Sequence, residues 1–105
     1  MALPGKKLGL LLSTHPESSA FRHGVNLAHA ALDAGVKVYL YCIDEAVFGL
    51  RDAQLQSLRS RGLSLYACAF GAQQRRVPLN ELAVFGGLAV VSDLMAATDQ
   101  FLAFN

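Results

Sequence analysis

The sequence has little charge, no tryptophan and only two cysteines. Of its 105 residues, 16% are charged and 53% are hydrophobic, and the formal net charge is +1. This composition excludes a disordered chain, which needs low hydrophobicity and high net charge. It also lacks the basic field with which proteins bind nucleic acids, so we expect no direct nucleic-acid partner. A surface with so few charges is typical of a protein that associates with copies of itself.

The sequence also lacks the common motifs for metals and cofactors. Cys42 and Cys68 are too few for a disulfide-built scaffold, and neither belongs to a CxxC motif of the zinc or dithiol redox type. No pair of histidines has ligand spacing together with a carboxylate. There is no GxGxxG, no GxxxxGK[ST] and no GxSxG. We therefore expect neither a metal nor an organic cofactor.

Long hydrophobic runs are absent as well. A membrane-spanning helix needs about 20 apolar residues, and no stretch approaches that length. The run Leu8–Leu12 follows two lysines but is too short for the core of a secretory signal, and Ser13–Pro16 stops it. We expect one domain over residues 1–105, located in the cytoplasm, where thiols stay reduced.

The pattern of apolar residues predicts alternating strands and helices. Strands are expected at 8–12, 36–42, 63–68 and 101–104, and helices at 52–61, at 70–76 and from a cap at Thr14 or Ser18 up to Gly35. Leu79–Phe85 reads as a weak helix or a loop, Leu88–Val91 as a short strand or turn, and Ser92 as the N-cap of a helix over 93–98. This alternation predicts an α/β fold with a mainly parallel sheet and helices on both faces. Ligands bind such sheets at the carboxyl ends of the strands.

Cys68 lies where that rule points, because it ends a predicted strand and opens a helix. Unpaired backbone N–H groups at such a position favour the thiolate, the nucleophilic form of cysteine. Arg75 and Arg76 follow about two turns later and would add positive potential if they fold back. The alternative interpretation of Cys68 is a small, buried, structural residue.

Other candidate residues share this edge of the sheet. Cys42 also ends a strand, and we expect it to be packed there, although a disulfide with Cys68 is conceivable if the strands are neighbours. His15 follows the first strand and would polarise the thiol or contact a partner. His23 and His29 fall off the apolar stripe of the first helix, and we expect both in solvent.

The segment from Leu63 to Val77, LSLYACAFGAQQRRV, delivers a single cysteine from a strand into an alanine-rich helix that ends in basic residues. In this it resembles the sulfur-relay members of the DsrE/DsrF-like family. Phe85–Ala89, followed by Ser92, Asp99 and Phe101–Phe104, is similar to the family's C-terminal half. Ser18–Phe21 with Ala28 and Gly35 is similar to its first helix.

The resemblance implies a flavodoxin-like three-layer α/β/α sandwich with about five mainly parallel strands, assembled into trimers or hexamers. It further implies a sulfurtransferase that carries sulfur as a cysteine persulfide between donor and acceptor proteins. Cys68 is the matching cysteine. The stretch Ile43–Arg51 is shorter than in relay subunits, so we expect a more open or differently lined lip around Cys68.

Three functional hypotheses follow. The first is a persulfide carrier that works through Cys68, and an exposed, acidic thiol favours it. The second is a non-catalytic oligomeric binding module that uses the same edge for a small ligand or a protein partner, and a buried thiol favours it. The third is an oxidation sensor in which Cys42 and Cys68 pair, which requires Cα atoms within about 7 Å. The apolar segment Leu79–Val91 carries one charge, Glu81, and we expect part of it at a subunit interface.

Overall fold

A computed structural model describes residues 4–105 of the chain. Its helices are α1 (Ser19–Asp33), η1 (Asp44–Gly49), α2 (Ala53–Ser60), α3 (Ala69–Gln74) and α4 (Leu88–Ala97), where η1 is a 3₁₀-helix. Its strands are β1 (Lys7–Leu12), β2 (Lys37–Cys42), β3 (Ser64–Cys68), β4 (Val84–Gly86) and β5 (Gln100–Phe104). The five strands form one parallel sheet in the order β4-β3-β2-β1-β5.

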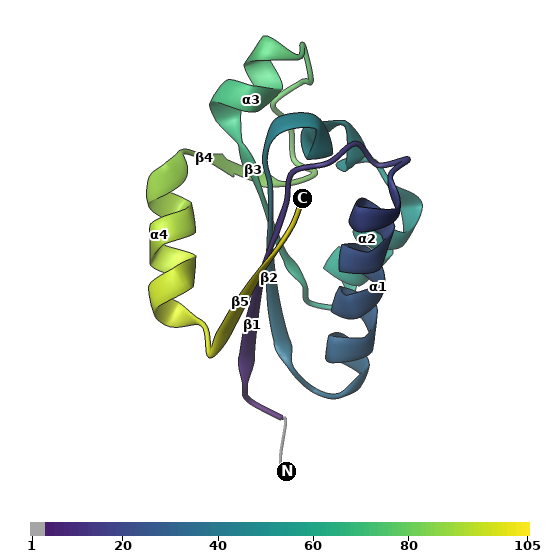
Figure 1. Ribbon diagram of the computed structural model, residues 1–105, viewed down its shortest axis with the longest axis vertical. Coiled ribbons are helices and arrows are strands. Elements are labelled where there is room, and N and C mark those ends of the chain that lie inside the picture. Colours follow the sequence, from purple (N-terminus) through teal and green to yellow (C-terminus); the bar gives the residue numbers. More distant parts are fainter. Residues whose placement is uncertain (1–3) are drawn as a thin grey trace.

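The helices flank this sheet on both sides, with α1 and α2 on one face and α4 on the other (Figure 1). The short helix α3 and the 3₁₀-helix η1 lie at the carboxyl end of the sheet. The predicted flavodoxin-like three-layer α/β/α sandwich is therefore confirmed. Within residues 4–105, no helix is long and apolar enough to cross a membrane.

The two faces of the sheet bury very different amounts of apolar surface. The face under α1 and α2 holds the larger core, which includes Leu10, Phe21 and Leu55, all with no exposed surface. Among residues 4–105, the face under α4 has only three buried residues, namely Tyr41, Cys68 and Leu94. Because side chains alternate along a strand, neighbouring residues belong to different cores.

The first two long helices begin and end as the sequence predicts. Ser18, not Thr14, is the N-cap of α1, since its Oγ accepts a hydrogen bond from the Phe21 N–H at 3.2 Å. The helix ends at Gly35, which has a φ of +83°. Helix α2 ends in the same way at Gly62, with a φ of +112°. Glycine adopts this left-handed conformation without a steric penalty.

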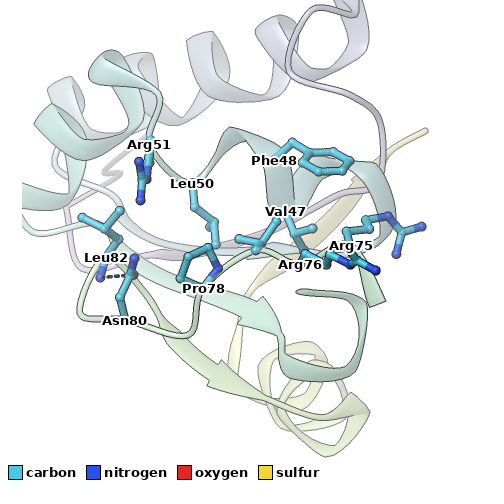
Figure 2. Close-up of a pocket in the computed structure, with 10 residues that line it drawn as sticks. Val47, Phe48, Leu50, Arg51, Arg75, Arg76, Pro78, Asn80 and Leu82 are labelled. Carbon is cyan, nitrogen blue, oxygen red and sulfur yellow. Dashed lines mark hydrogen bonds between the residues drawn. The ribbon is translucent and has the colours of Figure 1, made fainter. Parts of the chain in front are cut away.

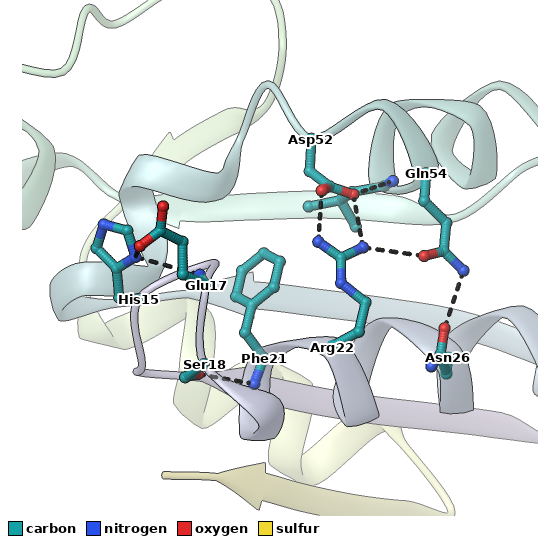
Figure 3. A network of polar contacts seen from close by, with 9 residues as sticks. His15, Glu17, Ser18, Phe21, Arg22, Asn26, Asp52 and Gln54 are labelled. Carbon is teal, nitrogen blue, oxygen red and sulfur yellow. Dashed lines mark hydrogen bonds and ion pairs between the residues drawn. The ribbon is translucent and has the colours of Figure 1, made fainter.

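A partly buried ion pair holds α1 and α2 together (Figure 3). The Arg22 guanidinium donates two hydrogen bonds to Asp52, at 2.6 and 3.2 Å. Asp52 is also the N-cap of α2 and accepts from the Leu55 N–H at 3.0 Å. The bonds from Arg22 and then from Leu55 lower the pKa of Asp52 against the opposing effect of burial. A bidentate pair of this kind fixes the angle between two elements as well as their distance.

The segment after α3 differs from the prediction. Leu88–Val91 is neither strand nor turn, because it forms the first turn of α4, and Ser92 lies inside that helix instead of capping it. Gly87 is the N-cap. The fourth strand is Val84–Gly86, which begins inside Leu79–Phe85, the range expected as a weak helix or a loop. The physical reason is tertiary: Gly86 lets the first turn of α4 approach β4 closely, since a Cβ added there would lie 2.7 Å from Val90 Cγ2.

Candidate functional site

The Cys68 thiol lies at the carboxyl end of β3, where the sequence predicted it. It is the N-cap of α3, and its Sγ accepts a hydrogen bond from the Gly71 N–H at 3.3 Å. A donor in this position stabilises a sulfur atom that carries negative charge. The residue is 8% exposed, so it is nearly but not fully buried.

A surface pocket of about 340 Å³ gives access to the thiol. Its walls come from the end of β2, from α3 and from the start of α4. The residues that line it are Ile43, Asp44, Cys68, Phe70, Gly71, Gln74, Gly87 and Leu88. Phe70 is 67% and Leu88 is 65% exposed, so the rim is apolar and open to contact with another protein.

Tyr41 holds one wall of this pocket through hydrogen bonds to the backbone, although the sequence did not single it out. It is fully buried, and its hydroxyl donates to the carbonyl oxygens of Gly86 at 3.0 Å and Gly87 at 3.3 Å. Burial, then the charge of Cys68 and a hydrogen bond with it, raise the pKa of Tyr41. The register of β2 and β3 places Tyr41 at this pocket. Tyr41 pairs with Tyr66, and Tyr66 lies on the same face of β3 as Cys68, two residues later.

Arg75 folds back towards Cys68, which is the condition for it to add positive potential there, whereas Arg76 makes no such contact, and neither side chain lines the pocket. The Arg75 Nη1 donates to the Gly71 carbonyl at 3.3 Å, and its Nη2 lies 3.9 Å from Asp44 Oδ1. A Cβ placed on Gly71 would lie 3.6 Å from Cys68 Sγ and 3.7 Å from Arg75 Nη1, so both groups flank this glycine. Positive charge thus lies near the thiol, partly balanced by the Asp44 carboxylate in the pocket wall.

Cys42 is a structural residue on the opposite face of the sheet. It has no exposed surface and belongs to the core under α1 and α2. It pairs with Ala67, the residue before Cys68, so the two thiols point to different faces and both are free. This geometry argues against the disulfide sensor, since Cβ atoms that point apart cannot be bridged. Burial raises the pKa of the Cys42 thiol to about 12.

The histidines do not reach Cys68. His15 packs against Phe48, with 5.8 Å between ring centroids, and its Nδ1 accepts from the Glu17 N–H at 3.1 Å (Figure 3). It is absent from the residues that line the Cys68 pocket. His23 and His29 are exposed on α1, as expected. Across residues 4–105, no group of three or more His, Cys, Asp or Glu side chains is placed to hold a metal ion.

Comparison with known proteins identifies the fold. No family model matches the chain. No curated protein matches it either. Among solved structures, the YchN protein from E. coli superimposes with a TM-score of 0.80 at 19% sequence identity, over 94% of this chain and 99% of that chain. The chain therefore has a DsrE-like fold, as its resemblance to that family implied.

Proposed function

We propose that this chain is a sulfur-relay sulfurtransferase of the cytoplasm, which carries sulfur as a persulfide on Cys68. The observation that supports this proposal best is the position of the thiol. Cys68 ends a central strand of a DsrE-like fold, opens into a pocket, and holds its sulfur against the Gly71 N–H at 3.3 Å. Ligand chemistry in parallel sheets is concentrated at this edge.

The reaction consists of two exchanges, and each balances without a metal, oxidant or cofactor. The Cys68 thiolate attacks the outer sulfur of a donor persulfide, R–S–SH. The new bond gives Cys68–S–SH, and the donor leaves as the thiolate R–S⁻. An acceptor thiolate then attacks the same outer sulfur, takes it as its own persulfide, and releases the Cys68 thiolate. Both exchanges follow the ordinary course of thiolate attack on a sulfur–sulfur bond.

The pocket residues have distinct roles in this scheme. The Gly71 N–H steadies negative charge on the Cys68 sulfur. The apolar side chains of Phe70 and Leu88 restrict water around the persulfide and offer contact area to a donor or acceptor protein. Tyr41 holds the backbone of Gly86 and Gly87, which fixes the wall formed by the start of α4.

An apolar surface that includes Leu88 of the pocket rim supports assembly into a homo-oligomer, which we propose to be a trimer or hexamer. Exposed large apolar side chains gather on β4, α4 and the loop before them. Leu79, Val84, Leu88 and Met95 are 48%, 61%, 65% and 58% exposed. Three of them fall in Leu79–Val91, the segment expected at an interface. Large apolar patches on a small domain mark interaction surfaces.

Mass spectrometry of the intact reduced protein tests the proposed chemistry. After incubation with a sulfane-sulfur donor, the chain and its Cys42→Ser variant should gain one sulfur atom, whereas Cys68→Ser should gain none. Cys42→Ser is the matched control, because it removes the other thiol of the chain. Retention of the added sulfur in Cys68→Ser would contradict the proposal.

The low exposure of Cys68, 8%, is the observation that favours a non-catalytic binding module instead. In that case the pocket would hold a ligand or partner while the thiol only packs. The two functions separate in one experiment. A Cys68 that neither gains sulfur nor reacts with iodoacetamide in the folded protein would establish the binding module as the better account.

A further inference from the structure

A second pocket lies between η1 and the segment after α3, away from the thiol (Figure 2). Its volume is about 180 Å³. Val47, Leu50 and Pro78 form an apolar floor, and three arginines surround it. Figure 2 shows Arg51 at one end of the pocket and Arg75 and Arg76 at the other. No aspartate or glutamate is among the residues that line it.

Two of these three arginines, Arg51 and Arg76, differ from the other four in the chain. Arg22 and Arg61 are held by the carboxylates of Asp52 and Asp33, at 2.6 Å each. Arg59 donates to the Glu81 carbonyl at 2.7 Å. By contrast, the side chains of Arg51 and Arg76 make no hydrogen bond or ion pair with any residue from 4 to 105. The two guanidinium groups without a protein partner therefore both lie at the same pocket.

The backbone of Arg76 provides an independent argument. Helices α1, α2 and α3 all end in the same way. The residue two positions after the C-cap donates its N–H to a carbonyl five residues earlier, at 3.0 Å for α1, 3.1 Å for α2 and 2.8 Å for α3. The residue before that donor adopts a left-handed conformation. In α1 and α2 this residue is a glycine, whereas in α3 it is Arg76, with a φ of +56°.

A left-handed conformation costs a non-glycine residue about 1–2 kcal/mol. Arginine thus occupies a position where glycine would be more stable and where two other helices of this chain use glycine. Strained residues of this kind gather at ligand sites. Because the Arg76 side chain has no partner among residues 4–105, its contribution to folding does not explain the strain.

We propose that this pocket binds a small organic anion, with an apolar body the size of one ring and a carboxylate, phosphate or sulfate group. The apolar floor would hold the body, the Arg76 guanidinium would bind the anionic oxygens, and Arg51, at the opposite end of the pocket, would add positive potential. Planar guanidinium groups match such oxygens in pairs. A body of one ring fits a pocket of this volume, since a cavity of about 150 Å³ in another protein holds benzene. Arg75 contributes less charge than the other two, because Asp44 lies 3.9 Å from it.

Titration with phenyl phosphate, followed by NMR, tests this proposal. We expect binding at about 1 mM or tighter, with shifts concentrated around Val47, Leu50 and Val77. The double variant Arg51→Gln/Arg76→Gln should weaken binding by about tenfold or more. The matched control Lys37→Gln/Arg61→Gln removes the same charge at positions that do not line the pocket, and should change binding by less than about twofold.

Two further controls make the test decisive. Arg76→Gly should weaken phenyl phosphate binding while raising the Tm, which separates lost binding from lost folding. Cys68→Ser should bind phenyl phosphate unchanged, so this proposal stands or falls independently of the persulfide chemistry. No binding by the unmodified chain, equal weakening in the two double variants, or equally tight binding of the neutral benzyl alcohol would overturn the proposal.

Discussion

At the scale of single residues, the two thiols of this protein show how one position along a strand decides a chemical role. Cys68 ends β3 and opens into a pocket, whereas Cys42 ends the neighbouring strand and faces the larger core. The sequence predicted the place of Cys68, because Leu65 and Ala67 alternate with it. It did not predict the role of Tyr41, since that depends on the pairing of β2 with β3 and not on local pattern.

The stability of the protein should fall in alkaline solution. Burial raises the pKa of Cys42 from the ordinary 9.0 to about 12, and the pKa of Tyr41 is also raised. A raised pKa in the folded state favours folding fully below the unfolded value, and this contribution is lost as pH rises. We therefore expect the free energy of unfolding, measured in urea, to decline between pH 9 and pH 12.

Cys42→Val serves as the control for this measurement, because valine is buried without a titrating group. Its free energy of unfolding should decline less steeply over the same range. An identical decline in the variant and the unmodified chain would show that Cys42 is not responsible.

At the scale of elements, local signals predicted some boundaries and failed at others. Gly35 and Gly62 end their helices because their positive φ angles suit no other residue as well. The prediction of a strand or turn at Leu88–Val91 was wrong, because a short apolar run is equally compatible with a strand and with a helix. The packing of α4 on the sheet decides that this run is helical. The sequence gives no sign of the start of α4, because its N-cap is Gly87, which has no side chain to accept a capping hydrogen bond.

The ion pair between α1 and α2 gives a prediction at this scale. Asp52→Asn keeps a side chain that caps α2 but loses the pair with Arg22, and should lower the free energy of unfolding by about 1 kcal/mol. Asp52→Ala also loses the cap, and should lower it by about 2 kcal/mol in total. Denaturation in urea at pH 7 measures both.

Measurements of stability at low pH provide a second test of the ion pair between Arg22 and Asp52. The pKa of Asp52 is lowered from 3.8, chiefly by the bond from Arg22. The stability that this carboxylate contributes is present above pH 3.8 and is lost as pH falls through the lowered pKa. The difference between the chain and Asp52→Asn should therefore shrink in strong acid. Asp33→Asn, at an exposed pair, is the control and should change stability much less. A constant difference at all pH values would contradict this assignment.

At the scale of the whole molecule, the sheet is covered unevenly. The face under α1 and α2 is a full core, whereas α4 alone covers the other face and keeps Met95 58% exposed. The low charge of the sequence predicts association and the apolar segment Leu79–Val91 predicts part of the interface, but the sequence does not single out Met95. Self-association through α4 and β4 would cover the exposed side chains and complete the rim of the Cys68 pocket.

Light scattering coupled to size-exclusion chromatography tests this assembly. We expect a mass three or six times that of the 11.2 kDa chain. Met95→Asp should dissociate it, because an unpaired carboxylate buried at an interface is costly. Ala30→Asp, on the exposed side of α1, is the matched control and should leave the mass unchanged. A monomeric unmodified chain at micromolar concentration would refute the oligomer.

The strand order also governs how this molecule forms during synthesis. β1 is an inner strand, yet the neighbour on one of its sides is β5, the last of the five strands to be synthesised. Until residues 100–104 emerge, the backbone groups on that side of β1 have no partner and could pair with another nascent chain. β1 thus gains its second neighbour only after the other four strands have been synthesised, when β5 joins it.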